Sequence, residues 1–291
     1  MRITFIGTSA GEGYPGVWCE CPNCAKARRL GGRNIRGNSC ALLDDDFLID
    51  MNAHFAAMAP RLGIAPSKIR GLLVTHPHMD HFAPEFLEKR AMNPDYRGLS
   101  DAKKRELISP CFTELPLLHV YGNTYTRKAL FSENFVMEEP DWTRVVFHLI
   151  EDGVPQRQDD LTLIPVRSNH GPRKGFCHNY ILERGGKTLF YATDTGSYDP
   201  DMMDIVLSHQ YDCVIVEGTF GLHDVTDPNH MCLKKDREML RLFNEHGLWK
   251  HGQNFHLTHI CPHWTPVHDE YAPMLKDEGI EVAYDGKIIE F

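Results

Sequence analysis

Residues Thr75-His76-Pro77-His78-Met79-Asp80-His81 follow directly on the apolar run Gly71-Leu72-Leu73-Val74. The apolar run predicts a buried strand, which places three imidazoles and a carboxylate at its end. Two histidines at positions i and i+2 of an extended segment point the same way, and a turn near Asp80 brings Asp80 and His81 to a neighbouring position. Imidazole binds zinc, iron, cobalt or nickel, and a carboxylate adds the negative charge that a second divalent cation needs. The stretch therefore predicts ligands for two adjacent metals; the alternative is an exposed loop whose histidines bind nothing.

The composition is typical of a soluble globular chain. Of 291 residues, 42% are hydrophobic and 24% are charged, so we expect one domain over residues 1–291. The net charge of -9 repels polyanions, which argues against a nucleic acid as the partner. No apolar run is long enough to cross a bilayer, and residues 1–6 begin a strand rather than a signal peptide. We therefore expect a cytoplasmic protein with no membrane partner.

Short apolar runs bounded by turn residues alternate with stretches of helical spacing. The runs predict strands at residues 2–6, 39–43, 47–50, 71–75, 118–121, 161–166, 179–183, 188–192, 212–217 and 254–258. Helical spacing predicts helices at residues 52–62, 200–209, 235–246 and 269–277. Groups of strands followed by helices predict an α/β fold of mixed sheets with helices on their outer faces.

Two further segments carry local predictions. Asp285-Gly286 is a dipeptide favoured in type I′ turns, so the apolar runs at 280–284 and 287–291 predict a terminal β-hairpin. Residues 83–116 are charged, contain several prolines and follow the metal motif directly. This segment is predicted to be a lid or substrate-selecting insertion, with a surface excursion of no active role as the alternative.

Three later residues offer the donors that a two-metal site still needs. His170, Asp194 and His259 each follow an apolar run, so each is predicted to lie at a strand end. A two-metal site takes about seven protein donors, and the opening motif supplies four of them. These three residues would complete the set.

The ordered set of donors resembles the metallo-β-lactamase superfamily, whose signature is His-x-His-x-Asp-His followed by a distant His, an Asp and a final His. The resemblance spans essentially the whole chain and implies a four-layer αβ/βα sandwich of two mixed β-sheets flanked by helices. It implies two divalent metal ions, zinc or manganese with iron as the alternative. By the resemblance, one metal is held by His76, His78 and His170, the other by Asp80, His81 and His259, and Asp194 bridges them.

The N-terminal segment narrows the resemblance. Cys19-Glu20-Cys21-Pro22-Asn23-Cys24, after the glycines at 7–13, is similar to PhnP-type cyclic phosphate phosphodiesterases and to protein B of pyrroloquinoline quinone biosynthesis. The quinone-pathway protein departs from the full metal signature, whereas this chain keeps every donor, which favours the phosphodiesterase branch. In that branch the three cysteines bind a structural zinc, with His263 or Cys261 as the fourth ligand, although the spacing to His263 is one residue longer than in the family.

The resemblance implies a hydrolase of a small, cyclic phosphodiester that acts through a metal-bridging hydroxide, which Asp80 helps to orient. A histidine beyond the strand at 212–217 would assist the leaving oxygen, with His230 as the better match and His223 as the reserve. His178, His256 and His268 are candidates to hydrogen-bond the ligands, although an ordinary structural role is favoured. The alternatives are a lactone or thioester hydrolase, an RNA 3′-end processing nuclease, and a non-hydrolytic iron-dependent oxidase in cofactor biosynthesis. A homodimer is compatible with each alternative.

Overall fold

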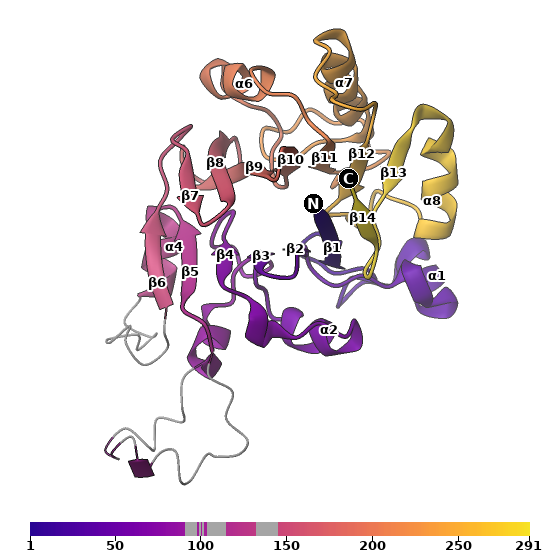
Figure 1. Ribbon diagram of the computed structural model, residues 1–291. Helices are drawn as coiled ribbons and strands as arrows, with labels where there is room; N and C mark the ends of the chain where they lie inside the picture. Colours follow the sequence, from indigo (N-terminus) through magenta and orange to yellow (C-terminus); the bar gives the residue numbers. More distant parts are fainter. Residues whose placement is uncertain (91–97, 99, 101, 104–114, 132–144) are drawn as a thin grey trace.

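The computed structural model describes residues 1–90, 98, 100, 102–103, 115–131 and 145–291. In this described part, two seven-stranded sheets face each other (Figure 1). The first sheet, in spatial order, comprises β14 (Ile288–Glu290), β1 (Arg2–Gly7), β2 (Cys40–Leu43), β3 (Phe47–Ile49), β4 (Gly71–Leu73), β5 (Leu118–Gly122) and β6 (Val145–Leu149). The second comprises β13 (Ile280–Val282), β12 (Phe255–Thr258), β11 (Cys213–Glu217), β10 (Lys187–Ala192), β9 (Cys177–Arg184), β8 (Leu161–Ser168) and β7 (Gln156–Gln158). Both sheets are mixed, as predicted.

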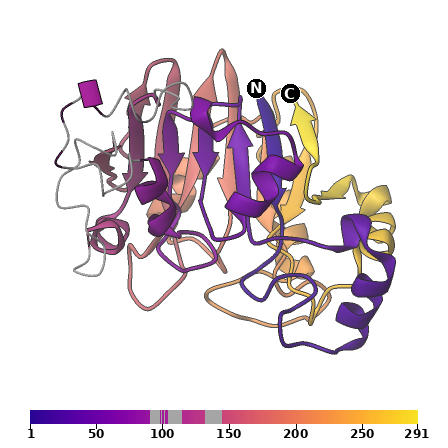
Figure 2. The same cartoon turned by 90° about the horizontal axis from the view of Figure 1, so that it is seen from below.

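Helices cover the outer faces of the sheets. They are α1 (Pro22–Leu30), α2 (Phe55–Arg61), α4 (Thr124–Leu130), α6 (Pro200–Leu207), α7 (Leu233–Glu245) and α8 (His268–Leu275), with short 3-10 helices η1 (Gly32–Asn34), η2 (Pro66–Lys68), η3 (Pro84–Arg90) and η5 (Lys276–Glu278). Helices α6 and α7 lie over the second sheet and α2 lies over the first, while α1 and α8 lie together at one side (Figures 1 and 2). No described helix has the length and apolar character needed to span a membrane.

The inner strands of each sheet are buried on both faces, which explains their nearly continuous apolar sequences. On β10, Leu189 and Tyr191 pack between the two sheets, whereas Phe190 packs under the helices of the second sheet. On β1, Phe5 points between the sheets and Ile6 points to the opposite face. Strands buried in this way read as apolar runs without polar alternation. The polar residues that follow such runs are therefore concentrated at the strand ends, where the candidate site forms.

Most of the predicted elements are confirmed. The predicted helices at 52–62, 200–209, 235–246 and 269–277 appear as α2, α6, α7 and α8, and every predicted strand has a counterpart. Strands β6 and β7 and helices α1 and α4 were not predicted from the sequence. Of the predicted lid at 83–116, Pro84–Arg90 forms η3, and most of the remainder lies outside the described residues.

The predicted terminal hairpin is wrong, because its two strands belong to different sheets. Strand β13 pairs in parallel with β12, and β14 pairs antiparallel with β1. The Asp285 carboxylate accepts hydrogen bonds from the Thr8 hydroxyl (2.7 Å) and from the Gly37 amide (2.6 Å), and the Gly286 amide donates to the Phe5 carbonyl (2.7 Å). These contacts fix the Asp-Gly turn against the first sheet, so the turn carries the chain from one sheet to the other.

Candidate metal centre

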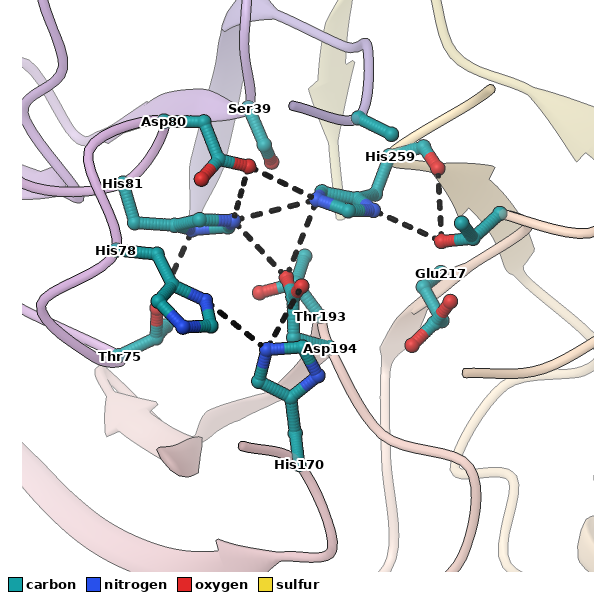
Figure 3. Close-up of polar contacts among 12 residues, drawn as sticks. Ser39, Thr75, His78, Asp80, His81, His170, Thr193, Asp194, Glu217 and His259 are labelled. Atoms are coloured by element: carbon teal, nitrogen blue, oxygen red, sulfur yellow. Dashed lines mark hydrogen bonds and ion pairs between the residues drawn. The ribbon is translucent and has the colours of Figure 1, made fainter. Parts of the chain in front are cut away.

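The seven predicted ligands, far apart in sequence, converge at one edge of the sandwich. His76, His78, Asp80 and His81 follow β4, His170 follows β8, Asp194 follows β10 and His259 follows β12. Figure 3 shows the labelled members of this set pointing toward one another. The structure thus brings together every residue that the sequence proposed for the two-metal site, whose role as ligands stays a prediction.

Three imidazoles form the first half of the centre. Nδ1 of His78 lies 2.9 Å from Nε2 of His76 and 3.2 Å from Nε2 of His170. All three nitrogens fall within 4.8 Å of one another, close enough to share one ion. Burial is the main cause that lowers the pKa of His76 well below its ordinary value, which favours the neutral imidazole that a metal requires.

Two imidazoles and a carboxylate form the second half. Nε2 of His81 lies 3.2 Å from Nε2 of His259, and Oδ2 of Asp80 lies 3.4 Å and 3.7 Å from these two nitrogens (Figure 3). This group also fits within 4.8 Å. These two groups divide the histidines as the sequence resemblance implied. A further group of His76, His81 and Asp194 also falls within 4.8 Å, so the assignment of each histidine to one ion stays a prediction.

Asp194 lies between the two halves. Its Oδ1 lies 3.8 Å from Nε2 of His170, and its Oδ2 lies 3.0 Å from Nε2 of His81 and 3.3 Å from Nε2 of His259. One carboxylate therefore faces both groups, as a bridging ligand would. Its Oδ2 is buried and accepts no well-formed hydrogen bond within the described part of the chain, which is costly for a carboxylate oxygen without a cation.

The electrostatics of the pocket favour cations. Burial opposes a charge on His81, but Asp194, Asp80 and Asp50 together raise its pKa well above the ordinary value. A site that draws a proton onto a fully buried imidazole carries excess negative charge. Divalent cations would neutralise that charge, and five imidazoles with two carboxylates form a donor set suited to zinc, manganese or iron. The residues present therefore fit the two metals that the resemblance implies.

Several site residues have an unusual backbone conformation. Asp50, Asp194 and His259 have φ values of 61°, 55° and 56°, in the left-handed region that residues other than glycine rarely adopt. Asp50 and His259 directly follow β3 and β12, and one residue separates Asp194 from the end of β10. Such conformations persist only where the surrounding structure enforces them, and they cluster at functional sites.

Hydrogen bonds at the far nitrogens orient the imidazoles. Nδ1 of His81 lies 2.7 Å from Oδ2 of Asp50, and Nδ1 of His259 lies 2.8 Å from Oγ1 of Thr219. Nδ1 of His170 lies 3.2 Å from the carbonyl of Asn229. Such contacts fix the tautomer and the direction of a ligand ring. The sequence prediction did not include Asp50, Thr219 or Asn229. Asp50 could have been found, because it is a carboxylate at the end of an apolar run, which is the signal that identified Asp194.

The three histidines considered for this orienting role bond elsewhere. His178 contacts Asp152 (2.7 Å) and His256 contacts Asn254 (2.7 Å). Nδ1 of His268 lies 3.1 Å from the Arg36 guanidinium. Their structural roles agree with the interpretation that the sequence favoured.

Of the two histidines proposed to assist the leaving group, the structure places His230 at the centre. Its Nδ1 lies 3.0 Å from Oε2 of the fully buried Glu217 and 4.0 Å from Oδ1 of Asp194. Burial opposes a charge on His230, but Glu217 outweighs burial and raises the pKa of His230 to about 9. His223, in contrast, is exposed and stacks on Trp264. The sequence prediction did not include Glu217.

A second donor cluster lies at the start of α1. The thiols of Cys19, Cys21 and Cys24 fall within 4.8 Å of one another, and the Gly16 amide donates to Sγ of Cys24 (3.2 Å). The Asn23 amide donates to the carbonyl of Pro262 (2.9 Å), which ties this cluster to the loop after β12.

Cys261 and His263, the two candidates for the fourth zinc ligand, lie in that loop. They form a separate group of donors with Glu12. The three thiols suit a structural zinc, and the choice between the two candidates stays open.

The amino-acid sequence is similar to a known family and to curated proteins. A family model described as the beta-lactamase superfamily domain matches residues 45–260. Among curated proteins, the coenzyme PQQ synthesis protein B of Methylococcus capsulatus is 25% identical over 316 residues, which cover 98% of each chain. The protein of the same name from Pseudomonas putida is 27% identical over 318 residues and covers both chains fully (100% each).

Solved structures share the fold. A diphosphatase from the PhnP family aligns with a TM-score of 0.69 and 23% identity over 100% of this chain and 98% of that one. Zinc-bound PqqB from Methylobacterium extorquens aligns with a TM-score of 0.66 and 16% identity over 100% of both chains. The predicted sandwich of two mixed sheets flanked by helices is confirmed, as is the similarity to both branches.

Proposed function

This chain belongs to the beta-lactamase superfamily, and from that premise we propose that it is a metal-dependent hydrolase of a small phosphodiester, with a cyclic diester as the favoured substrate. The observation that carries the proposal is the position of Asp194, whose two oxygens face two separate groups of donors. Two metals held in this way would lower the pKa of a water molecule and neutralise charge on a phosphodiester. His76, His78 and His170 would hold one metal, and Asp80, His81 and His259 the other.

The protein's own groups have distinct tasks in this proposal. Oδ2 of Asp80 faces His81 and His259 and helps to orient the attacking water. Glu217 holds Nδ1 of His230, which leaves Nε2 as the atom that gives a proton or hydrogen bond to the leaving oxygen. Glu217 raises the pKa of His230 to about 9, which favours the protonated form that this task needs. Catalysis then needs no side-chain nucleophile.

A second candidate function is supported by the curated relatives, which align over the full chain and are coenzyme PQQ synthesis proteins. In that case the same donors would hold redox-active iron in a cofactor-biosynthesis oxidase rather than a hydrolytic pair. Imidazole and carboxylate ligands suit iron as well as zinc, so the donor set alone does not separate the two candidates.

Quantitative metal analysis combined with a substrate screen tests both candidates. Zinc or manganese together with turnover of cyclic or bis-aryl phosphodiesters would support the proposal. Turnover of lactones or thioesters alone would contradict it, as would iron accompanied by oxygen consumption. Short RNA substrates belong in the screen, although the net charge of -9 argues against them.

A further inference from the structure

A row of aromatic rings leads from the metal centre to the surface. The Phe220 ring lies 5.9 Å from that of His230 and 6.3 Å from that of His223, measured between centroids. The His223 ring lies 4.3 Å from the Trp264 ring, with an angle of only 16° between their planes. The inner end of the row, His230, approaches Asp194 to 4.0 Å. The outer end, Trp264, is 41% exposed, so the row connects the reaction site with solvent.

Close packing of two loops holds the outer pair in place. The loops follow β11 and β12, and the Leu222 amide donates to the Trp264 carbonyl (3.1 Å) across them. Gly221 has φ of 42°, and a Cβ at this position would lie 2.2 Å from Oγ1 of Thr265, so the loops meet at a site that only glycine allows. The Thr265 carbonyl in turn accepts from the Tyr14 hydroxyl (2.9 Å). These contacts hold the backbone segments that carry the two rings, and such preorganisation reduces the entropy lost on binding.

The chemistry of the pair suits a planar ligand. Exposed aromatic rings held parallel offer a π face, on which a planar ring gains stacking energy that an aliphatic group does not. The charges beside the pair are balanced, since Asp224 lies 3.5 Å from Lys234. This ion pair offers no unpaired positive charge to a polyanion, so the stacking face is the feature of the pair that a ligand would recognise.

We propose that His223 and Trp264 form a subsite that stacks a planar ring of the substrate, such as a nucleobase, while the phosphodiester lies at the metal centre. The inference rests on the proposed function and narrows its substrate class to small diesters that carry a planar ring. It also gives His223 a role in binding instead of proton transfer.

Steady-state kinetics of the metal-loaded full chain test this subsite. Two substrates are compared, adenosine 2′,3′-cyclic phosphate and the ring-free glycerol 1,2-cyclic phosphate. Trp264→Ala is expected to raise KM for the adenosine diester about tenfold, with kcat nearly unchanged and no effect on the glycerol diester. Trp264→Phe should restore most of the affinity because it keeps a π face. Trp18→Ala is the matched control, since Trp18 is an exposed tryptophan outside the row. Equal changes in KM for both substrates, or no change for either, would overturn the inference.

A binding measurement separates failure of the subsite from failure of the proposed function. Adenosine 5′-monophosphate is expected to quench tryptophan fluorescence in the wild type and in Trp18→Ala but not in Trp264→Ala, and ribose 5-phosphate should quench none of them. Quenching that depends on Trp264 in a protein that turns over neither diester would support the subsite and reject the phosphodiesterase. Normal turnover with quenching that survives in Trp264→Ala would reject the subsite alone.

Discussion

Oδ2 of Asp50 lies 2.7 Å from Nδ1 of His81, and both side chains are fully buried. Asp50 also accepts hydrogen bonds from the Thr75 amide (2.8 Å) and from the Thr75 hydroxyl (2.9 Å to Oδ2). One carboxylate therefore ties the first and last residues of the motif at 75–81 to the end of β3. Because Nδ1 of His81 is held in this way, Nε2 is directed at Asp194 and His259.

Replacing Asp50 with asparagine should weaken metal binding without unfolding the chain. Asparagine keeps the size of the side chain but removes the charge that orients His81, and loss of such a partner costs about 10- to 100-fold in metal affinity. Competition with a chromophoric chelator measures the affinity, and circular dichroism checks the fold. Asp45→Asn is the control, because Asp45 is exposed and pairs with Arg2. Wild-type affinity in Asp50→Asn would show that the contact has no orienting role.

Replacing His78 with alanine should abolish turnover while the fold persists. Nδ1 of His78 lies within 3.2 Å of both neighbouring imidazole nitrogens, so its loss removes the central donor of the first half of the centre. The expected fall in kcat/KM exceeds the ~100-fold that removal of an outer partner can cause. Metal content and the thermal transition are measured in parallel, with the exposed His246→Ala as control. Full activity in His78→Ala would refute the ligand assignment.

The sequence predicted which residues would lie together at the centre because each group of candidate ligands follows an apolar run. Strand ends gather at one edge of a sandwich, so polar residues at those positions meet even when they are far apart in the chain. The same signal was present at Asp50 and Glu217, which end the predicted strands at 47–50 and 212–217. Each of these two carboxylates contacts a histidine instead of joining a group of metal donors, and such a contact depends on tertiary structure that no local pattern encodes.

The failed hairpin shows where local reasoning about the fold ends. Asp285-Gly286 has the composition of a hairpin turn, and the runs on both sides of it do form strands. Their partners, however, are β12 in the second sheet and β1 in the first, and β1 lies at the opposite end of the chain from β14. Tertiary pairing overrides turn propensity here, and the sequence contains no short-range sign of it.

Replacing Gly11 with alanine should lower activity by displacing Asp80. A Cβ on Gly11 would lie 3.1 Å from Oδ2 and 3.3 Å from Cγ of Asp80, so the carboxylate would have to shift by a few tenths of an ångström. Displacement of a reacting group by ~1 Å can cost about 100-fold, so a fall of about tenfold in kcat/KM is expected here. Gly37→Ala is the matched control, since its Cβ would meet His54 at an ordinary 3.5 Å. Equal activity in both variants would contradict the prediction.

Replacing His230 with alanine should affect substrates according to their leaving groups. A general acid typically contributes 10²- to 10⁴-fold to the rate, and the contribution is smallest when the leaving oxygen needs no proton. The loss in kcat should therefore be large for an alkyl phosphodiester and small for bis-p-nitrophenyl phosphate. Glu217→Gln should reproduce part of this pattern, because it removes the charge that raises the pKa of His230. An equal loss for both substrates would instead indicate a role in binding or in structure.

His268 should make the stability of the fold sensitive to acid. Burial, followed by Arg36 and Arg33, lowers the pKa of His268 from 6.5 to about 4, and its Nδ1 lies 3.1 Å from the Arg36 guanidinium. Between pH 6.5 and pH 4 the unfolded state therefore binds a proton at His268 that the folded state does not. The free energy of unfolding is unaffected by His268 above pH 6.5 and falls as the pH drops toward 4, by about 3 kcal/mol at most. Burial raises the pKa of Asp285 to about 6, so Asp285 acts in the opposite direction over the same pH range.

The informative quantity is hence the difference in free energy of unfolding between the wild type and His268→Asn, measured by urea titration from pH 7 to pH 4.5. This difference should shift in favour of the variant as the pH falls, whereas a difference independent of pH would show that His268 takes up its proton as easily in the folded state as in the unfolded one.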